Sequence, residues 1–251
     1  MKYRRARIVT LVLLATLIQG CGRPAYHIVR PGESLYLISW RYDQDYHDLA
    51  TWNGLAPPYT VRPGQSIALA RPPGSGAPQV NPGVSTPATR SPPSVAEKSA
   101  PLAKAKAKRQ QPQDAQTAQT VPLSNAKPRW RWPVRGELIH GFDGKAKGIQ
   151  GRGLDIAGRD GAAIRSAAAG QVVYSGSGIP SYGNLLIIKH NERYLSAYAY
   201  NRRLLVREGE AVRDGQVIAE MGSSSTASTQ AMLHFEIRLN GKPVDPARLL
   251  P

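Results

Sequence analysis

The sequence has few of the residues that hold a large core or a covalent framework together. Of its 251 residues only 7% are aromatic, and Cys21 is the only cysteine, so no disulfide can form within the chain. The apolar run near the N-terminus, residues 8–18, is about half of the ~20 residues that span a bilayer as a helix. With 21 prolines and 24 glycines, the composition favours small domains joined by loose sequence.

The first 20 residues have the layout of an export signal, with a basic start followed by the apolar run. Residues 17–21, Leu-Ile-Gln-Gly-Cys, resemble the bacterial lipobox, which implies cleavage before Cys21 and acylation of its thiol. Residue 22 is Gly, whereas Asp there retains such lipoproteins at the inner membrane, so the resemblance implies anchoring at the periplasmic face of the outer membrane. A plain secretory peptide with an incidental cysteine is the alternative.

Acidic residues are also scarce, with 17 against 33 lysines and arginines, which gives a formal charge of +16. Removal of the signal, with its four basic residues, leaves +12. An export signal argues against nucleic acid as the partner of this basic chain. We therefore expect attraction to envelope polyanions, namely peptidoglycan carboxylates and lipopolysaccharide phosphates.

Residues 26–70 have the pattern of a small strand, helix, helix, strand unit. Residues 26–29 alternate as in a strand, and Leu35, Ile38 and Tyr42 share one side of a helix that Ser34 can cap. A second short helix would end at residues 53–54, Asn-Gly, and residues 66–69 give a closing strand.

This order, with Tyr-His-Ile-Val-Arg-Pro-Gly-Glu-Ser-Leu at the front and Trp-Asn-Gly-Leu and Val-Arg-Pro-Gly-Gln-Ser-Ile behind, resembles the LysM module over the whole unit. The resemblance implies binding of N-acetylglucosamine units of glycan chains between two loops. Carried over, the binding residues are Gly32, Glu33, Ser34, Leu35, Asn53, Gly54 and Leu55. For Leu35 and Leu55 core packing is the stronger interpretation, and the main chain around the two glycines is favoured for sugar hydrogen bonds.

Residues 71–128 form a basic linker of Pro, Ala, Ser, Thr, Gln and Lys, without aromatic residues, and this composition predicts a flexible tether. Residues 129–251 then change to short β-rich runs separated by glycine, which predicts an all-β domain. In residues 233–239 His234, Glu236 and Arg238 share one face, and in residues 193–200 Ser196, Tyr198 and Tyr200 do, so the polar faces of two strands are expected to build one groove.

Six segments of this domain resemble the lysostaphin/LytM-type zinc endopeptidases, which have a duplicated hybrid motif-like fold. The segments are Gly-Leu-Asp-Ile-Ala at 153–157, Ala-Gly-Gln-Val-Val at 169–173, the run at 182–190, Tyr-Ala-Tyr at 198–200, Gly-Gln-Val-Ile at 215–218 and Leu-His-Phe-Glu-Ile at 233–237. In active members two histidines and an aspartate bind zinc, and two further histidines are catalytic. Here Asp155 and the ligand His234 are kept, but Gly151 stands for the other ligand, and Tyr200 and Met232 stand for the catalytic histidines. Catalytic zinc normally needs three protein ligands, so we expect no metal, no cofactor and no peptidase activity.

A LysM module followed by a degenerate LytM-type domain on a lipoprotein resembles the NlpD branch of the NlpD/EnvC murein hydrolase activators. The resemblance implies a periplasmic N-acetylmuramoyl-L-alanine amidase as partner, bound by the vacated groove and shifted toward its open state. By carry-over the groove comprises Gly151, Arg152, Asp155, Tyr198, Tyr200, Met232 and His234. For Tyr198 and Asp155 an internal, structural role stands as an equal alternative. A passive wall-binding tether and an active endopeptidase are the alternative functions.

Overall fold

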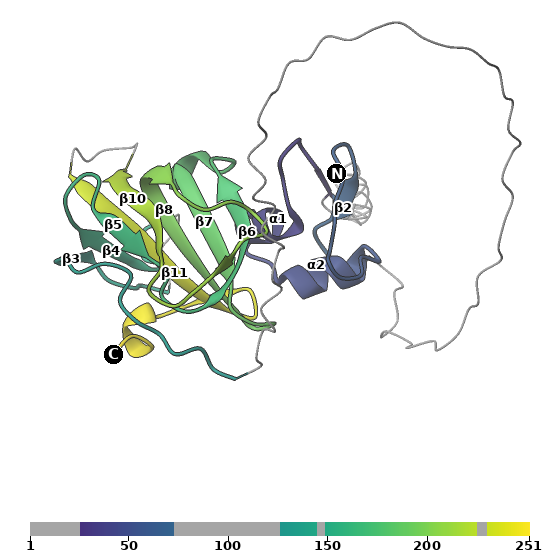
Figure 1. Ribbon diagram of the computed structural model, residues 1–251. Helices are drawn as coiled ribbons and strands as arrows, with labels where there is room; N and C mark the ends of the chain where they lie inside the picture. Colours follow the sequence, from purple (N-terminus) through teal and green to yellow (C-terminus); the bar gives the residue numbers. More distant parts are fainter. Residues whose placement is uncertain (1–25, 73–125, 145–148, 225–229) are drawn as a thin grey trace, which may run out of the picture. The chain divides into compact units, whose positions relative to one another are not determined.

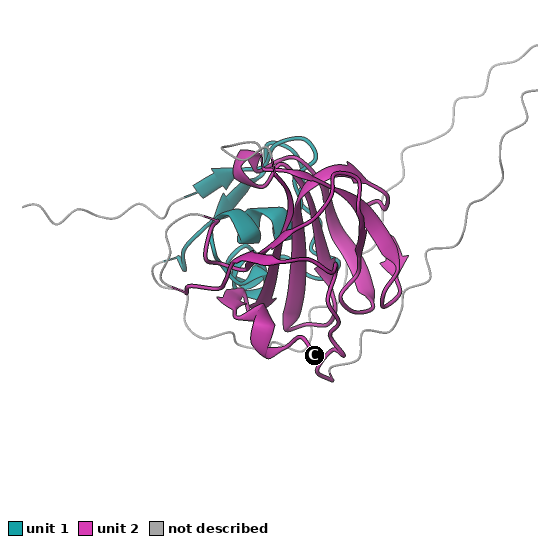
Figure 2. Ribbon diagram, turned by 90° about the vertical axis from the view of Figure 1, so that its left-hand side faces the viewer, with its two compact units in different colours: residues 1–72 teal, residues 73–251 magenta. Residues whose placement is uncertain are grey.

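The computed structural model describes residues 26–72, 126–144, 149–224 and 230–251. The chain divides into two compact units, Met1–Pro72 and Pro73–Pro251 (Figure 2). The predicted signal, Cys21 and nearly all of the predicted linker lie outside the described residues. No helix of the described segments is long and apolar enough to cross a membrane.

The N-terminal unit has the predicted strand, helix, helix, strand order (Figure 1). Its elements are β1 (Tyr26–Ile28), α1 (Leu35–Arg41), α2 (Tyr46–Trp52) and β2 (Ser66–Ala68). The two strands pair antiparallel, and both helices begin at a polar cap: the side chain of Ser34 accepts a hydrogen bond from the N–H of Leu37, and that of Asp45 accepts one from His47. The apolar sides of the helices meet in a small core that includes Leu35, as the helical spacing predicts.

The C-terminal unit is built on one large sheet, which confirms the predicted β-rich fold (Figure 1). Its strands are β3 (Leu138–His140), β4 (Leu154–Ala157), β5 (Ala163–Arg165), β6 (Gly170–Gly176), β7 (Asn184–Lys189), β8 (Tyr194–Leu204), β9 (Ala211–Val212), β10 (Val217–Ser223), β11 (Ala231–Leu239) and β12 (Lys242–Val244). Two short 3-10 turns, η1 (Pro180–Tyr182) and η2 (Pro246–Arg248), complete the elements of the described part.

The main path of the sheet runs β3-β4-β11-β10-β8-β7-β6-β9, with β5 beside β10, β12 beside β11 and a further pairing between β11 and β8. One side of the central strands packs into an apolar core that includes Leu154, Leu233 and Phe235. The alternating residues Asp155, His234 and Glu236 point to the other side and are nevertheless buried. β11 is therefore buried on both sides, and its charged side chains have no access to water.

The described part of the C-terminal unit starts at residue 126, two residues before the predicted end of the linker. The side-chain amide of Asn191 donates a hydrogen bond to the main-chain oxygen of Ala126 (2.9 Å), which ties residue 126 to the turn after β7.

Candidate glycan-binding and protein-binding sites

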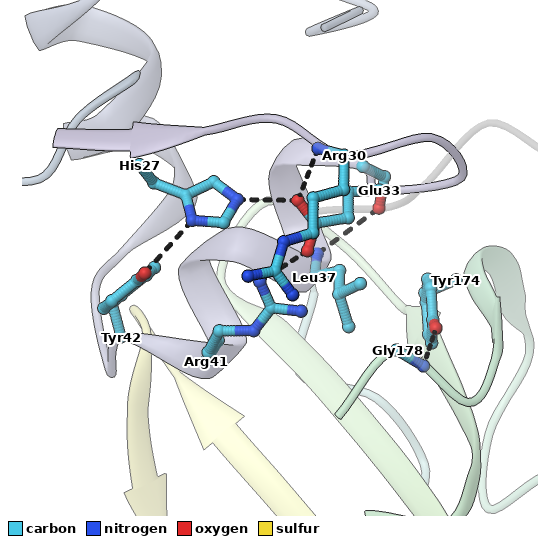
Figure 3. A network of polar contacts seen from close by, with 9 residues as sticks. His27, Arg30, Glu33, Leu37, Arg41, Tyr42, Tyr174 and Gly178 are labelled. Carbon is cyan, nitrogen blue, oxygen red and sulfur yellow. Dashed lines mark hydrogen bonds and ion pairs between the residues drawn. The ribbon is translucent and has the colours of Figure 1, made fainter. Parts of the chain in front are cut away.

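The loop after β1 is organised by the carboxylate of Glu33 (Figure 3). Oε2 of Glu33 lies 2.6 Å from Nε2 of His27 and accepts a hydrogen bond from the N–H of Arg30 (2.9 Å), while Oε1 accepts one from the guanidinium of Arg41. Nδ1 of His27 lies 3.0 Å from the hydroxyl of Tyr42. We call these five residues the Glu33 network. It joins β1, the loop and α1 around one carboxylate.

Burial opposes ionisation of Glu33, but hydrogen bonds from Arg30, His27 and Arg41, together with the charge of Arg41, outweigh it. They hold the pKa of Glu33 below its ordinary value. Because these donors are on the protein, the carboxylate is used internally, where it shapes the loop.

Three other predicted glycan-binding residues also have internal roles. The side chain of Ser34 caps α1, and Leu35 is fully buried in the small core, where the favoured interpretation places it. The amide of Asn53 donates to the carbonyls of Leu49 (2.8 Å) and Ala68 (3.0 Å), and its oxygen accepts from the N–H of Ala68 (2.7 Å). Asn53 therefore ties α2 to β2.

The two loop glycines remain open to a ligand. Gly32 and Gly54 are exposed, with φ of +79° and +64°, and nothing lies within 4 Å of the position that a Cβ would take at either residue. Leu55 is half-buried against the small core. The surface available for a sugar at these loops is thus mainly main chain.

The C-terminal unit holds a buried network around His234. Nδ1 of His234 lies 2.6 Å from Oδ1 of Asp155, and Nε2 lies 3.1 Å from Oε1 of Glu236. The hydroxyl of Tyr182 donates to the same oxygen of Glu236 (2.6 Å), and Arg238 approaches Oε2 at 3.3 Å. We call these five residues the His234 network. It connects β4, η1 and β11.

Burial alone would lower the pKa of His234 by disfavouring the imidazolium. The hydrogen bonds and charges of Asp155 and Glu236 outweigh that effect and raise the pKa to about 9. Burial likewise opposes ionisation of Glu236, but the charge of Arg238 and the contacts of His234 and Tyr182 hold its pKa below the usual range. The network is therefore a set of paired charges, with an imidazolium between two carboxylates near neutral pH.

Two glycines, Gly151 and Gly153, have backbone roles next to this network. A Cβ at Gly153 would lie 2.1 Å from the main-chain oxygen of Phe235, so only glycine allows the approach that brings Asp155 opposite His234. Gly151, where active peptidases have a zinc ligand, has φ of +83°, a conformation that L side chains rarely adopt. Asp143 donates its N–H to the oxygen of Gly151 (2.8 Å), which fixes that turn.

Tyr200 and Met232, at the two catalytic positions, lie beside His234. The Tyr200 ring centroid is 5.9 Å from that of His234, and Tyr200 is 5% exposed; Met232, two residues before His234 on β11, is 7% exposed. Burial and the nearby charge of Asp155 raise the pKa of Tyr200 to about 12, so this phenol stays protonated near neutral pH. Contacts in the structure join Asp155 and Tyr200 to His234, whereas Gly151 and Arg152 are included because of their predicted place in the groove. We call the six predicted groove residues other than Tyr198 the LytM site: Gly151, Arg152, Asp155, Tyr200, Met232 and His234.

Tyr198 does not belong to the LytM site, and its predicted place in the groove was wrong. It is fully buried, its ring packs 5.3 Å from that of Phe235, and its hydroxyl accepts the N–H of Ala167 (2.8 Å). The register between β11 and β8 explains this, because it places Phe235 opposite Tyr198 and His234 opposite Ala199, and opposed residues share a face.

Tyr200 reaches the His234 side because the strand departs from regular alternation there. Its φ is +64°, and the pairing of β8 with β10 shifts register directly after it, between Asn201 and Arg203. Regular alternation would have directed its ring to the side of Tyr198.

The structure adds His140 to this region, a residue that motif position did not select. Its Nδ1 lies 3.1 Å from Oδ2 of Asp155, because β3 and β4 pair with these two residues opposite each other. The side chain is about half exposed, so it is a surface group next to the buried network. By contrast His190 is internal: burial lowers its pKa to about 4, and its ring nitrogens face the oxygen of Ala169 and the hydroxyl of Ser196.

The donor set does not fit a catalytic zinc ion. Asp155 and His234 are present, but the third family position is a glycine with a left-handed backbone, and neither catalytic position carries an imidazole. Within the described ranges, no group of three or more His, Cys, Asp and Glu side chains is placed to hold a metal ion.

Comparisons with known proteins agree with this division of the chain. The LysM domain family matches residues 27–69, and Peptidase family M23 matches residues 150–246. A zinc-containing peptidase from Vibrio cholerae superposes with a TM-score of 0.44, at 32% identity over 47% of this chain and 39% of that chain.

Several curated relatives match both units. The lipoprotein NlpD/LppB homolog of Pseudomonas aeruginosa is 50% identical over 231 residues, covering 90% of this chain and 76% of the relative. Murein hydrolase activator NlpD of Escherichia coli (strain K12) is 35% identical over 279 residues, covering 98% of this chain and 73% of the relative. With a LysM module, an M23 domain and these relatives, the chain belongs to the family of NlpD-like murein hydrolase activator lipoproteins of the cell envelope.

Proposed function

We propose that this chain is a peptidoglycan-binding outer-membrane lipoprotein that activates a periplasmic N-acetylmuramoyl-L-alanine amidase through its LytM site, and so promotes septal wall splitting and cell separation. The observation that carries the proposal is the LytM site itself. It keeps the architecture of a peptidase site around Asp155 and His234, but those charges are paired internally, and Tyr200 and Met232 replace the groups that would move protons.

The residues at the edge of the LytM site suit contact with a protein. Arg152 is half-buried, and Tyr200 and Met232 present small parts of otherwise buried side chains. Arginine, tyrosine and methionine are enriched in protein interfaces, where most of the energy comes from a few well-packed side chains. Activation further requires that this surface prefers the open state of the amidase over its closed state.

Retention at the wall would come from the N-terminal unit. The exposed main chain around Gly32 and Gly54 offers donors and acceptors to a glycan, and the Glu33 network and Asn53 hold the two loops in place. Acylation of Cys21 would add attachment to the outer membrane, since several acyl chains together anchor a protein stably.

The test is release of label from purified sacculi. The mature chain with Cys21→Ser, which cannot be acylated, should release no label alone and should accelerate release by a periplasmic amidase. Stimulation of no periplasmic amidase would favour a passive tether. Label release by the chain alone, with stoichiometric zinc, would establish an endopeptidase and overturn the proposal.

Substitutions at the LytM site make the same assay specific. Met232→Asp and Arg152→Glu should abolish amidase activation, because each places a negative charge at the proposed contact. Since Met232 is mostly buried, circular dichroism must show that the fold is kept; half-buried Arg152 gives the second, less disruptive variant. Leu205→Asp is the matched control, because Leu205 is an exposed apolar residue outside the LytM site. Unchanged activation by both site variants would remove the LytM site from the mechanism.

A further inference from the structure

A cavity of about 700 Å³ lies beside β5 in the C-terminal unit, and none of the residues of the LytM site lines it. Its wall is formed by residues 131–136, which precede β3, together with Ala163 and Arg165 of β5 and Pro251. The wall carries Arg131, Arg135 and Arg165 and the indole of Trp132. We call it the arginine cavity. Its volume lies within the ordinary range of small-ligand sites.

Two of the arginines are held by one turn. Arg131 forms a two-pronged ion pair with Asp214, with Nε 2.5 Å from Oδ1 and Nη2 2.6 Å from Oδ2, and Arg165 donates from Nη1 to the oxygen of Gly215 (3.0 Å). Gly215 has φ of +72°, and a Cβ there would lie 2.8 Å from Nη1 of Arg131. The turn at 214–215 therefore positions both guanidinium groups before any ligand arrives.

The charge of these groups is only partly compensated. Asp214 neutralises Arg131, whereas the contact of Arg165 is to a neutral carbonyl. Arg135 is exposed and forms no ion pair or hydrogen bond with any residue in the described ranges. Arg165 and Arg135 thus offer planar forks of N–H donors, a geometry that matches a carboxylate.

Trp132 gives the cavity an apolar side. Its Nε1 donates to the oxygen of Pro251 (2.9 Å), which fixes the ring, and the residue remains 38% exposed. Pro133 and Val134 continue this surface. A ligand that combines carboxylates with small apolar side chains would use both sides of the cavity, whereas a phosphate group would use only the arginines.

We propose that the arginine cavity binds a short peptide that carries free carboxylates, with one carboxylate on Arg165 and Arg135 and an apolar side chain against Trp132. Because the proposed function places the chain at the wall, the peptide stems of peptidoglycan are the ligand of this chemistry. The N-terminal unit would then hold the glycan and the C-terminal unit its peptide.

The test is calorimetric titration of the mature Cys21→Ser chain with a synthetic stem peptide that lacks sugars, which removes the glycan that the LysM module would bind. Binding should weaken about 10-fold, or ~1.4 kcal/mol, in Arg165→Gln and in Arg135→Gln, and similarly when the carboxylates of the peptide are amidated. Added salt should also weaken it. Arg193→Gln, an exposed arginine outside the cavity, is the matched control and should bind as the unaltered chain does.

Three results would overturn the proposal: no binding, equal binding of the amidated peptide, or displacement of the peptide by equimolar inorganic phosphate. Failure here is distinguishable from failure of the proposed function. Met232→Asp should leave peptide binding intact, and Arg165→Gln should leave activation of the amidase on soluble muropeptides intact.

Discussion

The two units use similar side chains in opposite arrangements. In the Glu33 network one carboxylate is surrounded by donors from His27, Arg41 and the main chain of Arg30. In the His234 network one imidazole lies between the carboxylates of Asp155 and Glu236. The first joins residues at most 15 positions apart in the sequence, whereas the second joins residues 79 positions apart inside a sheet.

The two networks also differ in how completely their side chains are shielded from water. The carboxylate of Glu33 is itself mostly buried, but its partner Arg41 is partly exposed and Tyr42 lies at the surface, so water can replace part of the lost contacts. The side chains of His234, Glu236 and Arg238 are almost completely buried, so a lost charge leaves its partners unpaired in a low dielectric. We therefore expect the C-terminal unit to respond more strongly to charge removal.

The largest expected effect is that of Glu236→Gln. Loss of this carboxylate leaves His234 and Arg238 without their shared partner, and breaking such a buried pair costs about 3–5 kcal/mol in the free energy of unfolding. Glu33→Gln should cost less, about 1.5–3 kcal/mol, the range for hydrogen bonds to charged groups. Hydrogen exchange in increasing urea, read on peptides of each unit separately, measures both.

The control for these substitutions is Glu210→Gln, because Glu210 is exposed and belongs to neither network. Equal losses in the two units would contradict the comparison, because burial would then make no difference to the pairing energy.

A pH titration of stability should separate the units next. The pKa of His234 is raised from 6.5 to about 9, so its stabilisation is fully present below pH 6.5 and is lost as pH rises to about 9, by roughly 3 kcal/mol. The pKa of Glu33 is lowered, so its stabilisation is present above about pH 4.5 and is lost on further acidification.

The alkaline loss distinguishes the units, because the lowered pKa of Glu236 gives the C-terminal unit an acid loss as well. His234→Gln should flatten stability between pH 6.5 and 9. An alkaline loss that persists in this variant would mean that another group controls it.

A smaller effect tests the place of Tyr198 in the core. Tyr198→Phe removes the acceptor of the N–H of Ala167 and leaves that buried donor unpaired, which costs about 1–3 kcal/mol. Activation of the amidase, measured per folded molecule, should not change. Tyr194→Phe should be nearly neutral, because it removes from the same strand a hydroxyl that has no hydrogen-bond partner in the described part of the chain. If Tyr198→Phe lost activation while its stability was unchanged, Tyr198 would belong to the surface that contacts the amidase.

The sequence predicted features that depend on neighbouring residues. The cap at Ser34, the positive φ at Gly54 and the two helices all follow from rules that act within one turn. The closeness of Asp155 and His234 could also be expected, because the two motifs that contain them resemble the zinc-binding motifs of one peptidase site.

The errors lie where packing between distant segments decides. Strand alternation alone assigned Tyr198 to a polar face, but its register against β11 places it in the core. The positive φ at Tyr200 then turns the Tyr200 side chain to the opposite face, toward His234. The internal partners of Glu33 and Asn53 on α1 and β2 could not be identified without the fold, and contact of these two residues with a sugar stays a prediction. His140 was missed because strand pairing, not motif spacing, brings it to Asp155.

The smallest expected effect on stability is also the sharpest test of the main-chain surface in the N-terminal unit. Gly32→Ala and Gly54→Ala should each cost about 1 kcal/mol, because both residues have positive φ, and the new methyl group would stand in open space where a sugar would approach. Gly64→Ala is the matched control, since Gly64 has φ of +84° and equally open surroundings but lies outside the predicted binding loops. If glycan binds the main chain of these loops, all three variants lose similar stability and only the first two lose retention on sacculi. Equal retention in all three variants would mean that the sugar is bound elsewhere on the unit, and the Glu33 network would then be a purely structural feature, unlike the His234 network at the LytM site.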